Sequence, residues 1–177
     1  ISIVLFLAIP HFFDFKKKDK VIKNYLLENY GIKLSSYDGI DYHSLPLPSL
    51  NFSNVGISIG KDSLQINANN LIIYPKLIGI YNFENFETNK IILKNNKILI
   101  DDSELKILIK YIYNLKNRLT FKNLDLKINR QNKPLINIKK INFSNYGYEK
   151  NLVKGELFDK KFKILINNNY NKINFKF

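Results

Sequence analysis

The sequence predicts a mainly β protein with a few helices, and two kinds of periodicity carry that prediction. From residue 32 onward, short segments alternate apolar and polar residues, which is typical of strands with one apolar face. Three other stretches, near residues 16–31, 75–81 and 102–117, repeat apolar residues at helical spacing. We therefore expect a long, curved antiparallel β-meander with a covering helix near residues 102–117.

Residues 1–15 begin with an apolar run that only Ser2 interrupts before Pro10. About 13 helical residues span roughly 20 Å, less than the ~30 Å of bilayer hydrocarbon. The run is therefore predicted to be the C-terminal part of a membrane anchor helix whose first part precedes this segment. The hydrophobic core of a signal peptide and a buried strand are alternatives. The residues expected in the anchor are Ile3, Val4, Leu5, Phe6, Leu7 and Ile9.

A short amphipathic helix is predicted over residues 16–31. Val21, Ile22, Tyr25 and Leu26 recur on one helical face, and Gly31 stands where a C-terminal glycine is expected. The lysines at the start of this segment are typical of a cytoplasmic flank, so they leave the membrane orientation open.

Residues 32–177 are predicted to form one antiparallel β domain that continues beyond the segment. Turns are expected at Gly60-Lys61-Asp62, at Asn95-Asn96 and at Gln131-Asn132-Lys133-Pro134, because these residue types favour turns. The strands between these turns should share one apolar face. The residues expected to line that face are Ile57, Ile59, Leu64, Ile66, Leu71, Ile73, Leu124, Leu126, Ile128, Ile136 and Ile138.

The helix predicted near residues 102–117 has the clearest start signal in the chain. Asp101 and Glu104 have the spacing of a capping box, and an apolar stripe follows at Leu105, Leu108 and Ile112. Asp101 and Asp102 could also suggest a metal or acid–base pair. Because negative charge is favourable at a helix N-terminus, we interpret both as capping residues. The helix should cover part of the sheet.

The composition argues against several classes of function. The formal net charge is +13, yet Arg118 and Arg130 are the only arginines, so the guanidinium forks that favour nucleic-acid recognition are scarce. The absence of cysteine excludes disulfides and thiolate chemistry. His11 and His43 have no second ligand at metal spacing. We expect no enzyme, no catalytic or metal residues, no cofactor and no nucleic-acid partner.

Many apolar-faced strands and few helices leave apolar surface to be covered. Such a sheet must fold on itself, oligomerise or hold an apolar ligand, because large exposed apolar patches are disfavoured. Beside a membrane anchor, acyl chains are the natural ligand. We therefore expect the apolar face to form a groove that shields lipid.

The order of these features resembles the N-terminal region of the AsmA-like proteins of Gram-negative envelopes. The resemblance covers roughly residues 1–101, and its motifs are loose. The residues that carry it are Ile9-Pro10, Asn29-Tyr30-Gly31-Ile32, Gly39-Ile40-Asp41-Tyr42, Leu45-Pro46-Leu47-Pro48-Ser49-Leu50, Asn54-Val55-Gly56-Ile57, the strand pair over 64–71, Leu77-Ile78 and the run over 86–93.

This resemblance implies a single-pass inner-membrane protein with a periplasmic β-groove. Its expected role is outer-membrane biogenesis or phospholipid transport between the inner and outer membranes of the cell envelope. The expected partners are phospholipid or another lipid, the inner membrane and other envelope proteins. The alternative is a structural or scaffolding envelope module whose sheet edges bind partner proteins without carrying lipid.

Overall fold

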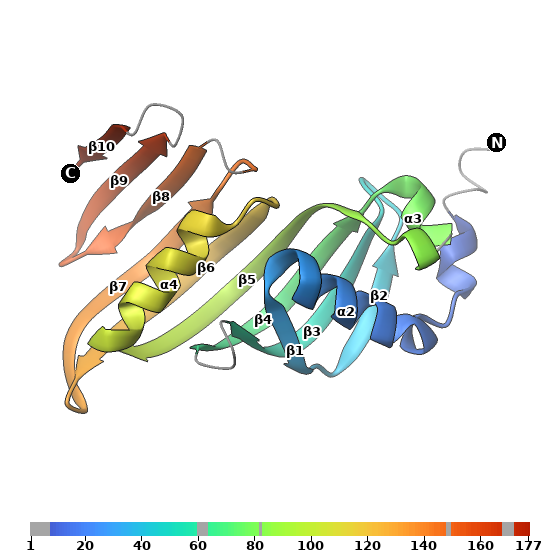
Figure 1. Ribbon diagram of the computed structural model, residues 1–177, viewed down its shortest axis with the longest axis horizontal. Coiled ribbons are helices and arrows are strands. Elements are labelled where there is room, and N and C mark those ends of the chain that lie inside the picture. The colour runs from blue at the N-terminus through green and yellow to red at the C-terminus, as the bar shows by residue number, and fades with distance from the viewer. Residues whose placement is uncertain (1–7, 60–63, 82, 148–149, 168–171) are drawn as a thin grey trace.

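The computed structural model describes residues 8–59, 64–81, 83–147, 150–167 and 172–177. Within these residues, ten strands form one sheet in the order β1-β3-β4-β5-β6-β7-β8-β9-β10, and β2 also pairs with β3 (Figure 1). The strands are β1 (Ile32–Ser36), β2 (Gly39–His43), β3 (Ser49–Ile59), β4 (Leu64–Pro75), β5 (Thr88–Asp101), β6 (Leu119–Arg130), β7 (Lys133–Ser144), β8 (Lys150–Leu157), β9 (Lys160–Asn167) and β10 (Lys172–Lys176). The mainly β prediction is confirmed.

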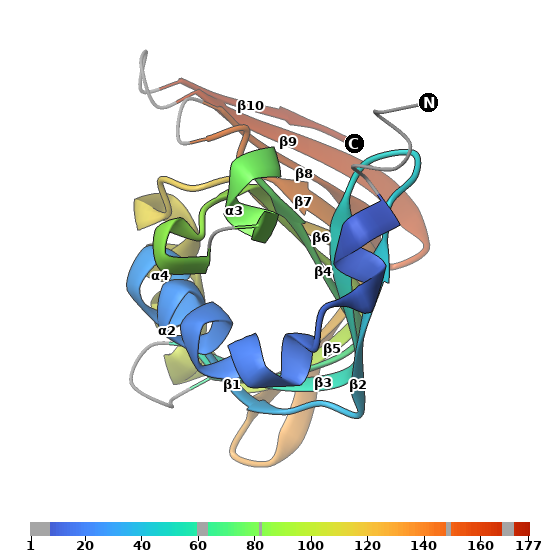
Figure 2. The ribbon, with the colours of Figure 1, turned by 90° about the vertical axis from the view of Figure 1, so that its right-hand side faces the viewer.

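The helices are short and lie mostly in the first two thirds of the chain. The α-helices are α2 (Asp19–Tyr30), α3 (Leu77–Tyr81) and α4 (Asp102–Asn114), and the 3₁₀-helices are η1 (Ile9–Phe12), η2 (Phe15–Lys18) and η3 (Phe83–Asn85). Figure 2 shows that the sheet is curved and that α2, α3 and α4 lie on its concave side. The buried apolar core lies between these helices and the sheet.

The predicted antiparallel meander is wrong in two places: β1 and β2 each pair with β3 and not with each other, and β5 and β6 are parallel. β5 and β6 pair in parallel, from Ile91 opposite Leu119 to Asp101 opposite Asn129, while the other strand pairs are antiparallel. The reason is α4, which returns the chain along the sheet before β6 begins. A parallel pair needs such a crossover, whereas an antiparallel pair can be joined by a tight turn.

Asn95 and Asn96 were predicted to form a turn but lie inside β5. Asn95 takes a left-handed backbone conformation with a φ of 52°, which asparagine tolerates better than most residues. The buried Asn96 side chain donates to the carbonyl oxygens of Leu93, at 2.9 Å, and Lys122, at 3.3 Å. These bonds hold the irregular backbone within the sheet, so the strand continues. Of the turn predicted at Gln131-Asn132-Lys133-Pro134, the first two residues form the turn, and both have positive φ, whereas Lys133 and Pro134 already belong to β7.

The two longer helices form where their end signals predict. α2 ends at Tyr30, and the φ of 61° at Gly31, the next residue, is the left-handed conformation that a C-terminal glycine supplies. α4 begins with the predicted capping box, in which the Asp101 backbone N–H donates to Glu104 at 2.8 Å. It ends at Asn114, three residues before the predicted end, because Leu115 is extended. The helix predicted over residues 75–81 begins at Leu77, since Pro75 belongs to β4.

The predicted anchor lies mostly outside the described residues. Ile3, Val4, Leu5, Phe6 and Leu7 are not described, and Ile9 begins η1 with 46% of its surface exposed. Among the described residues, no helix has the length and apolar composition needed to span a bilayer. The turn predicted at Gly60-Lys61-Asp62 also lies outside the described residues.

Candidate functional site

The concave face of the sheet carries a row of apolar side chains that crosses eight neighbouring strands. Residues directly opposite one another on paired strands project from the same face, so the register defines the row. In order across the sheet, its members are Phe52, Leu71, Leu93, Phe121, Phe143, Val153, Ile164 and Phe175. We call this set the apolar row.

A second row runs parallel to the first and contains several of the predicted lining residues. Its members are Leu34, Ile57, Ile66, Ile98, Leu126, Ile138 and Leu157. The concave face is therefore apolar over most of its width, as the alternation in the sequence predicts.

Helices cover the N-terminal part of this face. Ile22, Leu26 and Tyr30 of α2 are buried, as is Leu108 of α4, and they belong to the same core cluster as the buried strand residues. Side chains under the helices, such as Phe52 and Leu71, are completely buried. This half of the face is packed protein interior.

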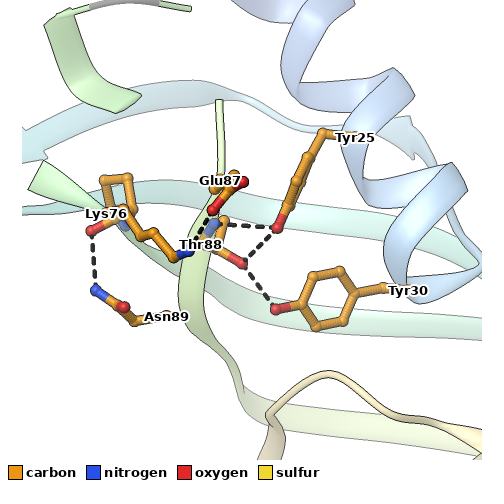
Figure 3. A network of polar contacts seen from close by, with 7 residues as sticks. Tyr25, Tyr30, Lys76, Glu87, Thr88 and Asn89 are labelled. Atoms are coloured by element: carbon orange, nitrogen blue, oxygen red, sulfur yellow. Dashed lines mark hydrogen bonds and ion pairs between the residues drawn. The ribbon is translucent and has the colours of Figure 1, made fainter. Parts of the chain in front are cut away.

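A polar network holds α2 against the start of β5 (Figure 3). The Thr88 backbone N–H donates to the Tyr25 hydroxyl at 3.0 Å, and the Thr88 hydroxyl lies 2.7 Å from the Tyr30 hydroxyl. Next to them, Lys76 and Glu87 form an ion pair. Burial raises the pKa of Tyr30 to about 12, although the Thr88 hydrogen bond opposes that shift. Both tyrosines therefore attach α2 to the sheet through their hydroxyl groups.

The two covering helices also contact each other directly. The Tyr111 hydroxyl of α4 donates to the backbone carbonyl of Tyr30 at 2.8 Å, and the side chain of Asn117, which follows α4, donates to the carbonyl of Asn29 in α2 at 2.6 Å. A cleft of about 560 Å³ lies between the C-terminal ends of the two helices. The two helices that cover the sheet are therefore joined to each other by specific hydrogen bonds.

The cover ends before the last strands. No described helix lies over β8, β9 and β10 in Figure 1. Along the apolar row, Phe121 and Phe143 are buried, Val153 and Ile164 are half-buried, and Phe175 is 54% exposed. The apolar concave face thus continues beyond its helical cover and becomes accessible.

The predicted lining residues fall into two groups. Nine are buried in the core, namely Ile57, Ile59, Leu64, Ile66, Leu71, Ile73, Leu124, Leu126 and Ile128. Ile136 and Ile138 are only partly buried and pack at the margin of the core. The structure therefore does not show a groove at most of these positions, because protein side chains already cover them.

The eleven residues predicted to line the apolar face do not include its accessible part. Val153, Ile164 and Phe175 alternate with Lys154, Lys163 and Lys176 in the sequence, so the period-two signal was present. What it lacked was the position of the helices, which decides which apolar residues are covered.

Polar chemistry is sparse among the described residues. They contain no group of three or more His, Cys, Asp or Glu side chains that could hold a metal ion. Asp101 and Asp102 have structural partners, since Asp101 caps α4 and the Asp102 carboxylate accepts from Arg130 Nε at 2.7 Å. His43 lies exposed in β2.

Comparison with known proteins adds no family assignment. No protein-family model matches the chain, and no curated protein is significantly similar to it. The likeness to AsmA-like proteins therefore rests on the residues quoted above and stays a prediction.

Proposed function

We propose that the chain is a lipid-holding β-module of the AsmA-like kind, closed by helices at one end and open at the other. The observation that supports this proposal best is the change in burial along the apolar row. The row is fully buried at Phe121, half-buried at Ile164 and exposed at Phe175, while it stays apolar throughout. An apolar ligand on β7 to β10 would bury the apolar side chains there, as the helices bury those on the earlier strands.

Acyl chains fit this surface for a physical reason. The accessible strip is lined by aliphatic and aromatic side chains that offer no directional bonds. Burying apolar area stabilises by about 25 cal/mol per Å², whichever hydrocarbon supplies the partner surface. The strip crosses successive strands about 4.8 Å apart, so an extended chain can lie across several of them.

The cellular role in this proposal comes from the resemblance. The module would be anchored in the inner membrane, with its β domain in the periplasm, and would serve outer-membrane biogenesis or phospholipid movement between the two membranes. α2 and its tyrosine network would close the sheet at the membrane-proximal end, and lipid would occupy the opposite end.

The register of β8 and β9 supplies a matched pair of variants to test this proposal. Val153 lies opposite Ile164 on the concave face, and the adjacent pair, Leu152 and Leu165, lies opposite on the convex face. All four side chains are half-buried. Val153→Asp with Ile164→Asp and Leu152→Asp with Leu165→Asp therefore change the charge equally on the two faces.

The measurement is native mass spectrometry and lipid extraction of protein purified in mild detergent. We expect phospholipid to accompany the wild type and the convex-face variant, and to be lost from the concave-face variant. Circular dichroism of both variants checks that each has folded. Equal lipid content in the two variants would contradict the proposal.

A scaffolding role is the alternative, and the exposed edge of the sheet supports it. In β10, Ile173 is 68% exposed and Phe175 is 54% exposed, and β10 pairs with β9 along one side. An unpaired edge can accept a strand from another segment or protein. Absence of lipid from the folded wild type would favour this role.

A further inference from the structure

Lysines from the last three strands lie side by side on the convex face of the sheet. Lys154 in β8 lies directly opposite Lys163 in β9, and Lys163 lies directly opposite Lys176 in β10. All three side chains are exposed. We call these residues the lysine row.

This arrangement is unfavourable in the isolated protein. Directly opposed residues on antiparallel strands have Cβ atoms about 5 Å apart, and like charges in such positions destabilise the sheet. Two opposed pairs that share Lys163 place three lysines side by side across β8, β9 and β10. A multiply charged anion bound there would remove the repulsion.

The lysine row lies in a hollow of about 450 Å³. The charged residues that line this hollow are Lys140, Lys154, Glu156, Lys161, Lys163 and Lys176. Glu156 is the only acidic residue among them, and its carboxylate lies 3.0 Å from Lys140 Nζ. The lining residues therefore supply no carboxylate reserved for the lysine row.

We propose that this hollow is a binding site for a phosphate group. A phosphate carries more than one negative charge in a compact volume, so several converging ammonium groups can contact it at once. Lysine binds phosphate as a point charge, and four of the residues that line the hollow besides Lys140 are lysines, namely Lys154, Lys161, Lys163 and Lys176. Asn142 also lines the hollow, and its side-chain amide donates to the Lys140 carbonyl at 3.0 Å.

This site is independent of the lipid-holding face. Lys163 and Ile164 are neighbours in β9 and project from opposite faces, because successive side chains alternate across a strand. The phosphate could belong to a lipid headgroup at a membrane surface or to a soluble phosphate compound. Both sources share the chemistry that the lysine row recognises.

The test compares two triple variants that remove equal charge from the same face. The first, Lys154→Gln with Lys163→Gln and Lys176→Gln, removes the lysine row. The second, Lys97→Gln with Lys122→Gln and Lys127→Gln, removes exposed lysines of β5 and β6. Urea unfolding measures the stability of both variants. We expect the first variant to unfold at a urea concentration at least as high as that at which the wild type unfolds.

Two probes distinguish the sources of phosphate. Calorimetric titration with inorganic phosphate at low ionic strength measures binding of the free anion. Sedimentation with phosphatidylcholine vesicles, with and without phosphatidic acid, measures binding to a lipid phosphate monoester. We expect loss of the lysine row to weaken binding at least about tenfold and the β5 and β6 variant to change it about twofold or less.

Each outcome decides the proposal. Selective loss with both probes supports a site that recognises a lipid headgroup, and selective loss with inorganic phosphate alone supports a site for a soluble phosphate compound. Equal weakening of the two variants would show diffuse charge attraction and overturn the proposal. Failure of the wild type to bind either probe would also overturn it. These outcomes concern the lysine row alone and do not test whether the concave face retains lipid.

Discussion

The hydroxyl group of Tyr111 donates a 2.8 Å hydrogen bond to the backbone carbonyl of Tyr30, and this bond joins the two helices that cover the sheet. Tyr30 is the last residue of α2, so its carbonyl has no partner within the helix. Tyr111 lies in α4, far along the chain. The bond therefore connects the start of the fold with the crossover between β5 and β6.

Tyr111→Phe should lower the free energy of unfolding by about 1 kcal/mol, the usual net contribution of one such hydrogen bond. The ring stays in place, so apolar packing changes little. Urea unfolding measures the difference. Tyr113→Phe is the control, because Tyr113 is 48% exposed on the same helix and should change stability by less than about 0.5 kcal/mol. Equal effects of the two substitutions would show that the hydrogen bond to Tyr30 does not contribute to the free energy of unfolding.

Stability should fall as the pH rises above about 10, in part through Tyr30. Its pKa is raised from 10.0 to about 12 by burial, so the folded protein keeps a proton that the unfolded chain releases. Its contribution is fully present below pH ~10 and is lost as the pH rises through about 12. Burial raises the pKa of Tyr111 as well.

The check is chemical unfolding at a series of alkaline pH values for the wild type and Tyr30→Phe. We expect a shallower decline in the variant, although it is less stable at neutral pH because it loses the bond to Thr88. Parallel declines in the two proteins would contradict the assignment of this proton to Tyr30.

Asn145→Ala should be one of the most damaging single polar substitutions. The side chain is fully buried and donates to the carbonyls of Leu115, at 3.1 Å, and Asn117, at 2.7 Å, while its oxygen accepts from the Leu119 N–H at 2.9 Å. Removing the side chain leaves these backbone groups without hydrogen-bond partners, which should lower the free energy of unfolding by about 3 kcal/mol. The exposed Asn137→Ala serves as the control in the same unfolding assay. A loss under about 1 kcal/mol would mean that the connection between α4 and β6 does not need these bonds.

Local signals in the sequence were sufficient to predict most of the helices and strands. The capping residues at Asp101 and Glu104, the glycine at Gly31 and the alternation of the strands act through neighbouring backbone, so they can be read from a short window. The end of α4 could not be read in this way. It depends on Asn145, which binds Leu115 and Asn117 from a distant part of the chain.

Long-range pairing explains the other differences. Nothing local distinguishes a parallel from an antiparallel partner for β5, because that choice depends on where α4 returns the chain. The same limitation applies to the candidate site. Ile57 and Ile164 have the same alternating context, yet one is fully buried and the other is accessible, because the helical cover reaches only the first.

If acyl chains occupy the uncovered concave face, a fluorescent side chain placed on that face will lie next to them. The chain contains no tryptophan, so Ile164→Trp and Leu165→Trp each introduce a single reporter, on opposite faces of β9. Each variant is mixed with phospholipid whose acyl chains carry bromine, a short-range quencher. We expect strong quenching for Ile164→Trp and little for Leu165→Trp. Equal quenching at the two positions, or none at either, would contradict this expectation.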